Sequence, residues 1–273
     1  MPFPAVNCSV FMGIFGEYDN SCTGEGMPSP YNQKQNLTDK SEFEEEIVMD
    51  SLHNICDAIV VLDTETSGLS FTRDEIIEFS AVRLEWDKGW KTVAEVDEFI
   101  RMTDDRKLDP RITELTGITD EMLREDGISK QAICELLAQL FTPNTLICAY
   151  NAQFDLLFLY HLLNKHGDAR LLQNQPKLDL LTVYRDRKPY PHKLCNAIEA
   201  YGLSDRVCNS HRAIDDVRAT VEVMREMCAE CADMERYVNL FGYSAKYGVS
   251  GPRISSVKYV PQGYRQTKKL YEL

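Results

Sequence analysis

The sequence predicts a mixed α/β fold, in which helices cover a β-sheet, from three observations. A continuous apolar run at residues 58–62 has the pattern of a strand buried on both faces. Two further strand-like segments follow it directly, and after Pro110 segments of helical period alternate with short strand-like runs. Strands that come first and then alternate with helices are typical of a mixed sheet with helices packed on it.

The first three strands are predicted to form an antiparallel meander. Ala58 to Leu62 is the first of them, Glu75 to Trp86 the second and Thr92 to Arg101 the third. The last two are joined around Asp87-Lys88-Gly89, which is short enough for a direct turn between neighbouring antiparallel strands.

The chain beyond Pro110 is predicted to be mostly helical. Residues 129–141 place their apolar side chains on one helical face, and the last long helix has the same spacing. The predicted elements are, in order, a helix over 129–141, a strand over 145–150, a helix over 153–165, a strand over 177–180, and helices over 180–187, 193–201 and 212–234.

The chain is predicted to carry an extension at each end of one central domain, residues 57–235. Residues 1–56 form an acidic extension with a short helix near 41–52, because the first 50 residues hold 2 basic and 9 acidic side chains and many turn-forming residues. Residues 236–273 form a Tyr-rich extension, in which residues 242–273 hold 6 basic side chains and 1 acidic one.

The composition excludes several classes of protein. With 44% apolar and 27% charged residues, the chain is neither collagen-like, nor a coiled coil, nor wholly disordered. No run approaches the ~18 apolar residues that a membrane span needs, and no basic segment precedes the apolar residues at the N-terminus, so neither a membrane nor a secreted protein is expected. The nine irregularly spaced cysteines favour free thiols and a cytoplasmic location.

The net charge of −13 makes broad binding to the duplex backbone a poor prediction, because affinity for phosphate comes mostly from Lys and Arg. It does not exclude an enzyme that acts on nucleic acid. Carboxylates gathered around metal ions also make a chain acidic.

A first polar cluster lies at the end of the predicted strand that begins at Ala58. Asp63 and Glu65 are two residues apart, so both side chains point to the same side of the strand. Burying two carboxylates together is costly unless a cation compensates their charge. The alternative is a solvated strand end.

Two more polar clusters lie where helices begin. Asn151 and Asp155 follow a strand and open a helix, where an acid is also stabilised simply by the helix dipole. His211, Asp215 and Asp216 lie at the start of the last long helix, and a His at such a place often has a structural role.

Together, the three clusters resemble the DEDDh 3′–5′ exonucleases, the family that includes the proofreading subunit of bacterial DNA polymerase III, RNase T and oligoribonuclease. The resemblance covers about residues 57–230 and includes the segment 111–119. It implies an RNase H-like fold, a mixed five-stranded sheet flanked by helices, here with N-terminal and C-terminal extensions. Tyr150 stands where the family often has His, and Ser67 where Thr is common.

The resemblance also implies a role for each polar position. Four carboxylates would hold two Mg²⁺ or Mn²⁺ ions: Asp63, Glu65, Asp155 and Asp216. His211 would be the general base, since imidazole titrates near neutral pH. Three positions would meet the terminal nucleotide: Thr64, Thr66 and Asn151. Asp215 competes with Asp216, and the family spacing from His211 favours Asp216.

The sequence therefore predicts a metal-dependent 3′–5′ exonuclease that hydrolyses phosphodiester bonds at the 3′ end of single-stranded nucleic acid, with DNA preferred, and releases nucleoside monophosphates. One alternative is an RNA-trimming exoribonuclease. Another is a non-catalytic nucleic-acid or polymerase-binding module, which is disfavoured because all five chemical positions are filled. The expected partners are a single strand with a free 3′ end and, as a candidate, a DNA polymerase or another replication or repair protein.

Two basic segments are further candidates for binding nucleic acid. In residues 242–273 positive charge is interleaved with five tyrosines, which suits phosphates and bases, although the segment is equally suited to packing on the acidic domain. The stretch 185–193 is a candidate for phosphate contacts, with solvated surface as the alternative.

Overall fold

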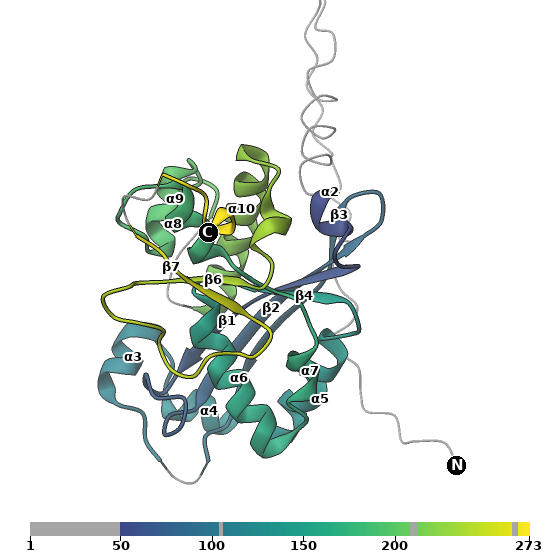
Figure 1. Cartoon of the computed structure of the whole chain (residues 1–273). Coiled ribbons are helices and arrows are strands. Elements are labelled where there is room, and N and C mark those ends of the chain that lie inside the picture. The colour runs from purple at the N-terminus through teal and green to yellow at the C-terminus, as the bar shows by residue number, and fades with distance from the viewer. Residues whose placement is uncertain (1–49, 104–105, 208–211, 264–266) are drawn as a thin grey trace, which may run out of the picture. The chain divides into compact units, whose positions relative to one another are not determined.

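The computed structural model describes residues 50–103, 106–207, 212–263 and 267–273. At its centre lies a five-stranded sheet of order β3-β2-β1-β4-β5 (Figure 1). The strands are β1 (Ala58–Thr66), β2 (Ile76–Trp86), β3 (Trp90–Phe99), β4 (Thr145–Ala149) and β5 (Lys177–Asp179), and a separate pair comprises β6 (Leu240–Tyr243) and β7 (Lys258–Pro261). The predicted antiparallel meander β1-β2-β3 is confirmed, and β4 and β5 continue the sheet in parallel with β1.

Helices flank the sheet, and those predicted from residue 129 onward occur in the predicted order, whereas the short helices over residues 110–116, 120–125 and 170–173 were not predicted. The helices are α2 (Asp50–His53), α3 (Pro110–Thr116), α4 (Asp120–Glu125), α5 (Lys130–Leu140), α6 (Ala152–His166), α7 (Arg170–Gln173), α8 (Leu180–Arg187), α9 (Leu194–Ala200) and α10 (Ala213–Glu230), with 3₁₀ turns η1 (Met234–Tyr237) and η2 (Leu270–Glu272). Of the helix predicted near 41–52, only residues from Asp50 onward lie within the described part. None of the helices in the described ranges is long and apolar enough to cross a membrane.

The last long helix ends earlier than the sequence predicts, at Glu230 rather than at residue 234. Cys231 is extended, with φ −157° and ψ 125°. The buried Arg187 donates hydrogen bonds to the carbonyl oxygens of Met227 and Cys231 and pairs with Asp233. This side chain thus binds two carbonyl oxygens at the C-terminal end of the helix, and so it stabilises the stop.

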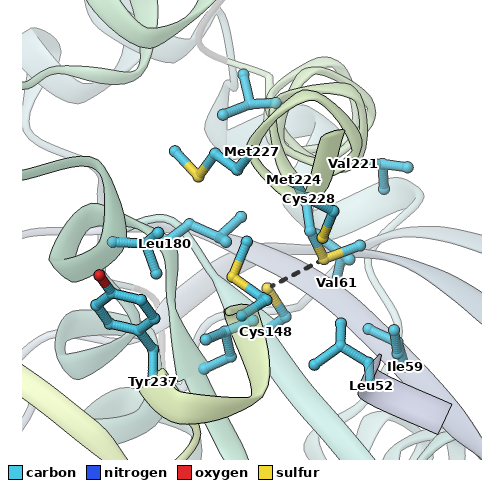
Figure 2. Close-up of a cluster of buried hydrophobic side chains, with 14 of the residues drawn as sticks. Leu52, Ile59, Val61, Cys148, Leu180, Val221, Met224, Met227, Cys228 and Tyr237 are labelled. Carbon is cyan, nitrogen blue, oxygen red and sulfur yellow. Dashed lines mark hydrogen bonds between the residues drawn. The ribbon is translucent and has the colours of Figure 1, made fainter. Parts of the chain in front are cut away.

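The two faces of the sheet bury separate cores. Val60 and Leu62 of β1 pack with α5 and α6 on one face. Ile59 and Val61 pack with α8, α9 and α10 on the other (Figure 2), where the Cys148 thiol lies 3.8 Å from the sulfur of Met224. Alternate residues of β1 thus serve opposite faces, which explains why the run reads as continuously apolar.

The C-terminal extension packs on the central domain through β6 and β7. The backbone N–H of Asn239 donates to the carbonyl oxygen of Lys177 at 2.7 Å, so the extension covers the edge strand β5. Leu240, Val260 and Leu270 are buried in the same core as α10. The alternative that this tail packs on the acidic domain is therefore confirmed for its described residues.

Candidate active site

The second half of β1 has one open edge. Its pairing with β2 runs to Thr66, whereas its pairing with β4 ends at Val61. Asp63 and Glu65 are half-buried on this stretch and alternate with the buried Thr64. Because side chains alternate along a strand and Val61 packs against α10, both carboxylates face the α10 side of the sheet.

The path of the chain after the end of β1 requires a glycine at position 68. A Cβ atom at this position would lie 2.5 Å from Oδ2 of Asp74, which accepts a hydrogen bond from the backbone N–H of Ser70. The loop after the strand is therefore folded tightly against itself. It leaves the side chain of Leu69 exposed.

Asp155 reaches β1 from the first turn of α6. It is 2% exposed, and its Oδ1 accepts a 2.7 Å hydrogen bond from the hydroxyl of Thr64. The start of α6 is held by Asp179, whose Oδ1 accepts from the backbone N–H groups of Asn151 and Ala152 at 3.0 and 3.1 Å. Asp179 caps α8 as well, so it combines a capping role with support of the site.

The predicted nucleotide contacts have distinct environments. Asn151 is exposed and has φ 71°, and its side chain makes no capping bond to α6, so it is accessible at the head of the helix. The side chains of Thr64 and Thr66 are buried and bond inward, Thr66 to the carbonyl oxygen of Gly68 at 2.7 Å. Only their backbone groups on the open edge of β1 are left for a substrate.

Glu78 fixes the start of α10, and sequence reasoning missed it. It lies on β2 directly opposite Glu65 of β1 and is fully buried. Its Oε1 accepts from Nε and Nη2 of Arg212 at 2.9 and 2.6 Å, and its Oε2 accepts from the backbone N–H of Ala213 at 3.1 Å. The signal in the sequence was an acid placed between the apolar residues Ile77 and Phe79 in the first half of β2.

Burial and the neighbouring carboxylates of α6 and α10 raise the pKa values of the two carboxylates on β1. Burial raises the pKa of Asp63 well above its ordinary value, and the nearby charges of Asp155, Asp216 and Glu65 raise it further. Burial followed by repulsion from Asp216 and Glu78 raises the pKa of Glu65 to about 8. Burial raises the pKa of Asp155 to about 7, although the hydrogen bond from Thr64 opposes the shift.

These mutual effects show which predicted residues come together. Asp63, Glu65, Asp155 and Asp216 interact, whereas Asp215 pairs with Arg218 at 3.6 Å. The structure thus places Asp216 near Asp63 and Glu65, and its assignment as a metal ligand stays a prediction. His211 lies outside the described residues.

The donor set fits a hard divalent cation. Its oxygens come from carboxylates, which Mg²⁺ and Mn²⁺ prefer, and a cation would relieve the repulsion that raises their pKa values. In the part of the chain that the structure describes, no group of three acidic, His or Cys side chains is arranged closely enough to hold a metal ion. The side chains would therefore have to draw closer on binding.

The basic stretch 185–193 makes mainly structural contacts. Arg187 is buried against Asp233, and Lys188 pairs with Glu230 at 2.6 Å. The carbonyl oxygen of His192 accepts from the hydroxyl of Tyr150 at 2.9 Å. Tyr150, the departure from the family pattern, thus ties the end of β4 to the segment before α9.

Comparison with known proteins identifies the family. Residues 60–224 match the RNase_T family model, described as an exonuclease. The PolC-type DNA polymerase III of Thermotoga maritima is 32% identical over 195 residues, and the chain spans only 14% of its length. The DNA polymerase III subunit epsilon of Treponema pallidum is 30% identical over 185 residues, which make up 64% of this chain and 78% of that protein.

Solved structures confirm the fold. Exonuclease I of E. coli in complex with a dT13 oligonucleotide superposes with a TM-score of 0.55 at 23% identity, covering 62% of this chain and 40% of that one. The RNase H-like, five-stranded mixed sheet predicted from the sequence is thus confirmed. Because the family model spans more than half of the residues and the fold agrees, the chain belongs to the RNase_T exonuclease family.

Proposed function

We propose that this protein is a metal-dependent 3′–5′ exonuclease that acts on single-stranded nucleic acid, with DNA preferred, and releases nucleoside monophosphates. The observation that carries the proposal is the group of four interacting carboxylates at the open end of β1, in a chain of the exonuclease family. Mutual repulsion in such a group has no structural benefit by itself, and a bound cation would remove it.

Asp63, Glu65, Asp155 and Asp216 would hold two Mg²⁺ or Mn²⁺ ions. When bound, such ions neutralise phosphate oxygens, activate water and stabilise the leaving oxygen. The protein itself orients this donor set. Thr64 holds Asp155 beside β1, and Glu78 holds the start of α10 through Arg212.

His211 would accept the proton of the attacking water. The water oxygen then bonds to phosphorus, the bond to the 3′ oxygen of the preceding nucleotide breaks, and this oxygen takes a proton from solvent. The products are a nucleoside 5′-monophosphate and a strand shortened by one nucleotide with a new 3′-hydroxyl. Asn151 and the backbone of Thr64 and Thr66 would hold the terminal nucleotide. Its free 3′-hydroxyl against this edge would restrict cleavage to chain ends.

We propose that the protein partner is a DNA polymerase or another replication or repair protein. The support is that two relatives are named as DNA polymerase III proteins, one of them a separate subunit. The match to the subunit includes 64% of the residues of this chain. Residues outside the match are therefore the first candidates for contacts with a polymerase.

A degradation assay tests the proposal. Single-stranded DNA, duplex DNA and RNA, each labelled at the 5′ end, should be compared in Mg²⁺, in Mn²⁺ and in EDTA. We expect stepwise shortening of single-stranded DNA with metal only. Faster shortening of RNA would favour the exoribonuclease, and internal cuts or full activity in EDTA would contradict the proposal.

Asp63→Asn is the informative variant for this assay. It should lower turnover about 10³-fold, equivalent to the several kcal/mol that metal ions contribute to such reactions. Asp87→Asn is the matched control, because Asp87 lies in the β2–β3 turn at the other end of the sheet and pairs with Lys91. Equal activity of the two variants would sink the assignment of the site.

A further inference from the structure

A cavity of about 410 Å³ lies between the loop after β1, the helix α6 that carries Asp155, and the C-terminal extension. Figure 1 shows the loop that joins β6 to β7 crossing α6. The lining of the cavity includes the side chains of Phe71, His161 and Arg253. His161 is six residues along α6 from Asp155, about 9 Å at 1.5 Å per residue. The volume is in the usual range for small-ligand sites.

The wall from the extension, residues 250–255, is attached to the first turn of α6, and we call it the strap. Nε2 of Gln153 donates to the carbonyl oxygens of Ser250 and Pro252 at 3.0 and 2.9 Å. The hydroxyl of Tyr259 donates to Oε1 of Gln153 at 2.6 Å and accepts from the backbone N–H of Ile254 at 3.0 Å. Gln153 precedes Asp155 by two residues, so the strap and the candidate active site share one helical turn.

The cavity combines aromatic rings with a positive charge. The rings of Phe71 and His161 meet edge to face, with centroids 6.2 Å apart. The exposed guanidinium of Arg253 is supported by the rings of Tyr243 and Tyr259, at 5.7 and 5.4 Å from their centroids. Rings that stack on bases and cations that meet phosphates are what single-stranded nucleic acid requires.

Positive charge continues past His161 into a neighbouring hollow of about 100 Å³. Its basic lining residues are Arg73, Arg106, Lys130 and Lys165, and its acidic ones are Asp74 and Glu75. Glu75 is already paired with Arg106 at 2.8 Å and with Lys130 at 2.6 Å. On a chain of net charge −13, this local excess of cations favours an anionic polymer.

We propose that the cavity binds a nucleobase of the single strand, a few nucleotides upstream of the 3′ end, while Arg253 contacts a backbone phosphate. The strap lies outside residues 60–224, the part that matches the family model, so this site is an addition to the shared exonuclease domain. The direction of the strand rests on the proposed function, whereas binding of a single strand to the cavity can be measured without any cleavage.

The test is oligonucleotide binding to the full chain in EDTA. Phe71→Leu keeps apolar volume but removes the ring, and Arg253→Gln removes an exposed charge. Each should raise the Kd of a 12-nucleotide oligo-dT about 5-fold or more, since stacking of one base contributes ~1 kcal/mol or more. Lys91→Gln, at the far end of the sheet, is the control for the lost charge and should leave the Kd within twofold. Unchanged affinity in both cavity variants would overturn the proposal.

Hydrolysis of the p-nitrophenyl ester of thymidine 5′-monophosphate separates this proposal from the proposed function. This substrate has one nucleotide and does not reach the cavity, so its kcat should survive Arg253→Gln. A wild-type protein that binds oligo-dT through the cavity but hydrolyses neither substrate would contradict the exonuclease and keep the cavity site. A large loss of ester hydrolysis in Arg253→Gln would show that Arg253 acts at the carboxylates and would overturn the proposal.

The position of the bound base is mapped with 2-aminopurine, placed in turn at each of the last six positions of the oligonucleotide. We expect fluorescence quenching at one interior position in the wild type, and loss of that quenching in Phe71→Leu. Quenching confined to the 3′-terminal base would overturn the upstream assignment. Thymidine 5′-monophosphate that displaces the interior base at equal affinity would identify a free-nucleotide site instead.

Discussion

Glu78 shows how much a single buried side chain determines here. Its carboxylate binds a guanidinium and a backbone N–H at the start of α10, although Arg212 is 134 residues away in the sequence. Asp216 lies one turn further on the same helix, and His211 immediately precedes the bonded pair. Glu78 is therefore a positioning residue, which places the third motif without itself facing a substrate.

Glu78→Gln should lower kcat for oligonucleotides about 10- to 100-fold and leave KM nearly unchanged, because a charged pair is replaced by weaker neutral bonds and α10 is held less firmly. The melting temperature should fall as well. Glu85→Gln, an exposed glutamate on the same strand, is the control. A Glu78→Gln enzyme with full kcat and only a lower melting temperature would show that Glu78 is purely structural.

Lys177 is a buried cation, and the free energy by which it destabilises the folded state depends on pH. Its Nζ donates to the carbonyl oxygens of Leu172 and Gln175 at 2.7 and 2.9 Å and to the hydroxyl of Ser256 at 3.0 Å. Burial lowers its pKa from 10.5 to about 8. Below pH 8 the folded state therefore bears the full cost of the buried charge, and this cost disappears as pH rises toward 10.5.

The free energy of unfolding of the wild type, minus that of Lys177→Met, should therefore rise by about 1 to 3 kcal/mol between pH 8 and 10.5. Urea unfolding at each pH measures it. Lys258→Met, on β7, controls for loss of an exposed positive charge. A difference that stays constant over this range would show that Lys177 is not buried as a cation.

At the scale of elements, the strap depends on glycine. Gly251 has φ +76°, and a Cβ atom there would lie 2.6 Å from Cδ1 of Leu157 on α6. Gly248 has nearly the same backbone, φ +74°, but open space around its Cα. Alanine at either position suffers the same backbone strain, and only at position 251 must the wall of the cavity shift.

Gly251→Ala and Gly248→Ala should therefore destabilise the fold by similar amounts, about 1 kcal/mol each. Only Gly251→Ala should also weaken binding of oligo-dT, by several-fold, because Leu157 and the strap both line the cavity. Melting curves and binding titrations of the pair separate the two effects. Equal loss of affinity in both variants would mean that backbone strain alone explains the change.

Elements that repeat a local pattern were predictable from the sequence, and those held by distant partners were not. The meander and α5 follow from apolar periodicity, and the motif carboxylates follow from their order along the chain. The strands β6 and β7 have four residues each and depend on contacts elsewhere, such as the backbone N–H of Gly242 with the hydroxyl of Thr182 at 2.8 Å. Gln153 and Glu78 were missed for the same reason, since their partners lie about 100 residues or more away.

At the scale of the whole molecule, the described residues of the C-terminal extension pack as part of the exonuclease domain. The charges and tyrosines of residues 242–273 suit both the binding of a single strand and packing on the domain. Because Val260 and Leu270 are buried in the core beside α10, and β6 covers the edge of β5, removal would expose apolar surface and unpaired backbone. Point variants in the strap therefore replace truncation as the test of its role in binding.

Repulsion between the clustered carboxylates also lowers the stability of the whole molecule, and one substitution can reduce this repulsion. Asp63 is near Asp155, Asp216 and Glu65, in a chain with thirteen more acidic than basic side chains, and repulsion raises its pKa. At neutral pH without metal, this repulsion destabilises the folded state. Asp63→Asn removes one of the charges and keeps the size of the side chain, so it should raise the melting temperature in EDTA by a few degrees, equivalent to about 1 kcal/mol for a chain of this size.

Addition of 10 mM Mg²⁺ should reverse the order of the melting temperatures, so that the wild type melts at a higher temperature than Asp63→Asn. The wild type gains stability because the cation binds the folded state only, whereas Asp63→Asn has lost a ligand and gains much less. Thermal melts of both proteins across a metal titration, with Asp87→Asn as the charge-matched control, measure this crossing. If wild type and Asp63→Asn gained equally from Mg²⁺, the carboxylates at the end of β1 would not be the metal site, and their repulsion would need another explanation.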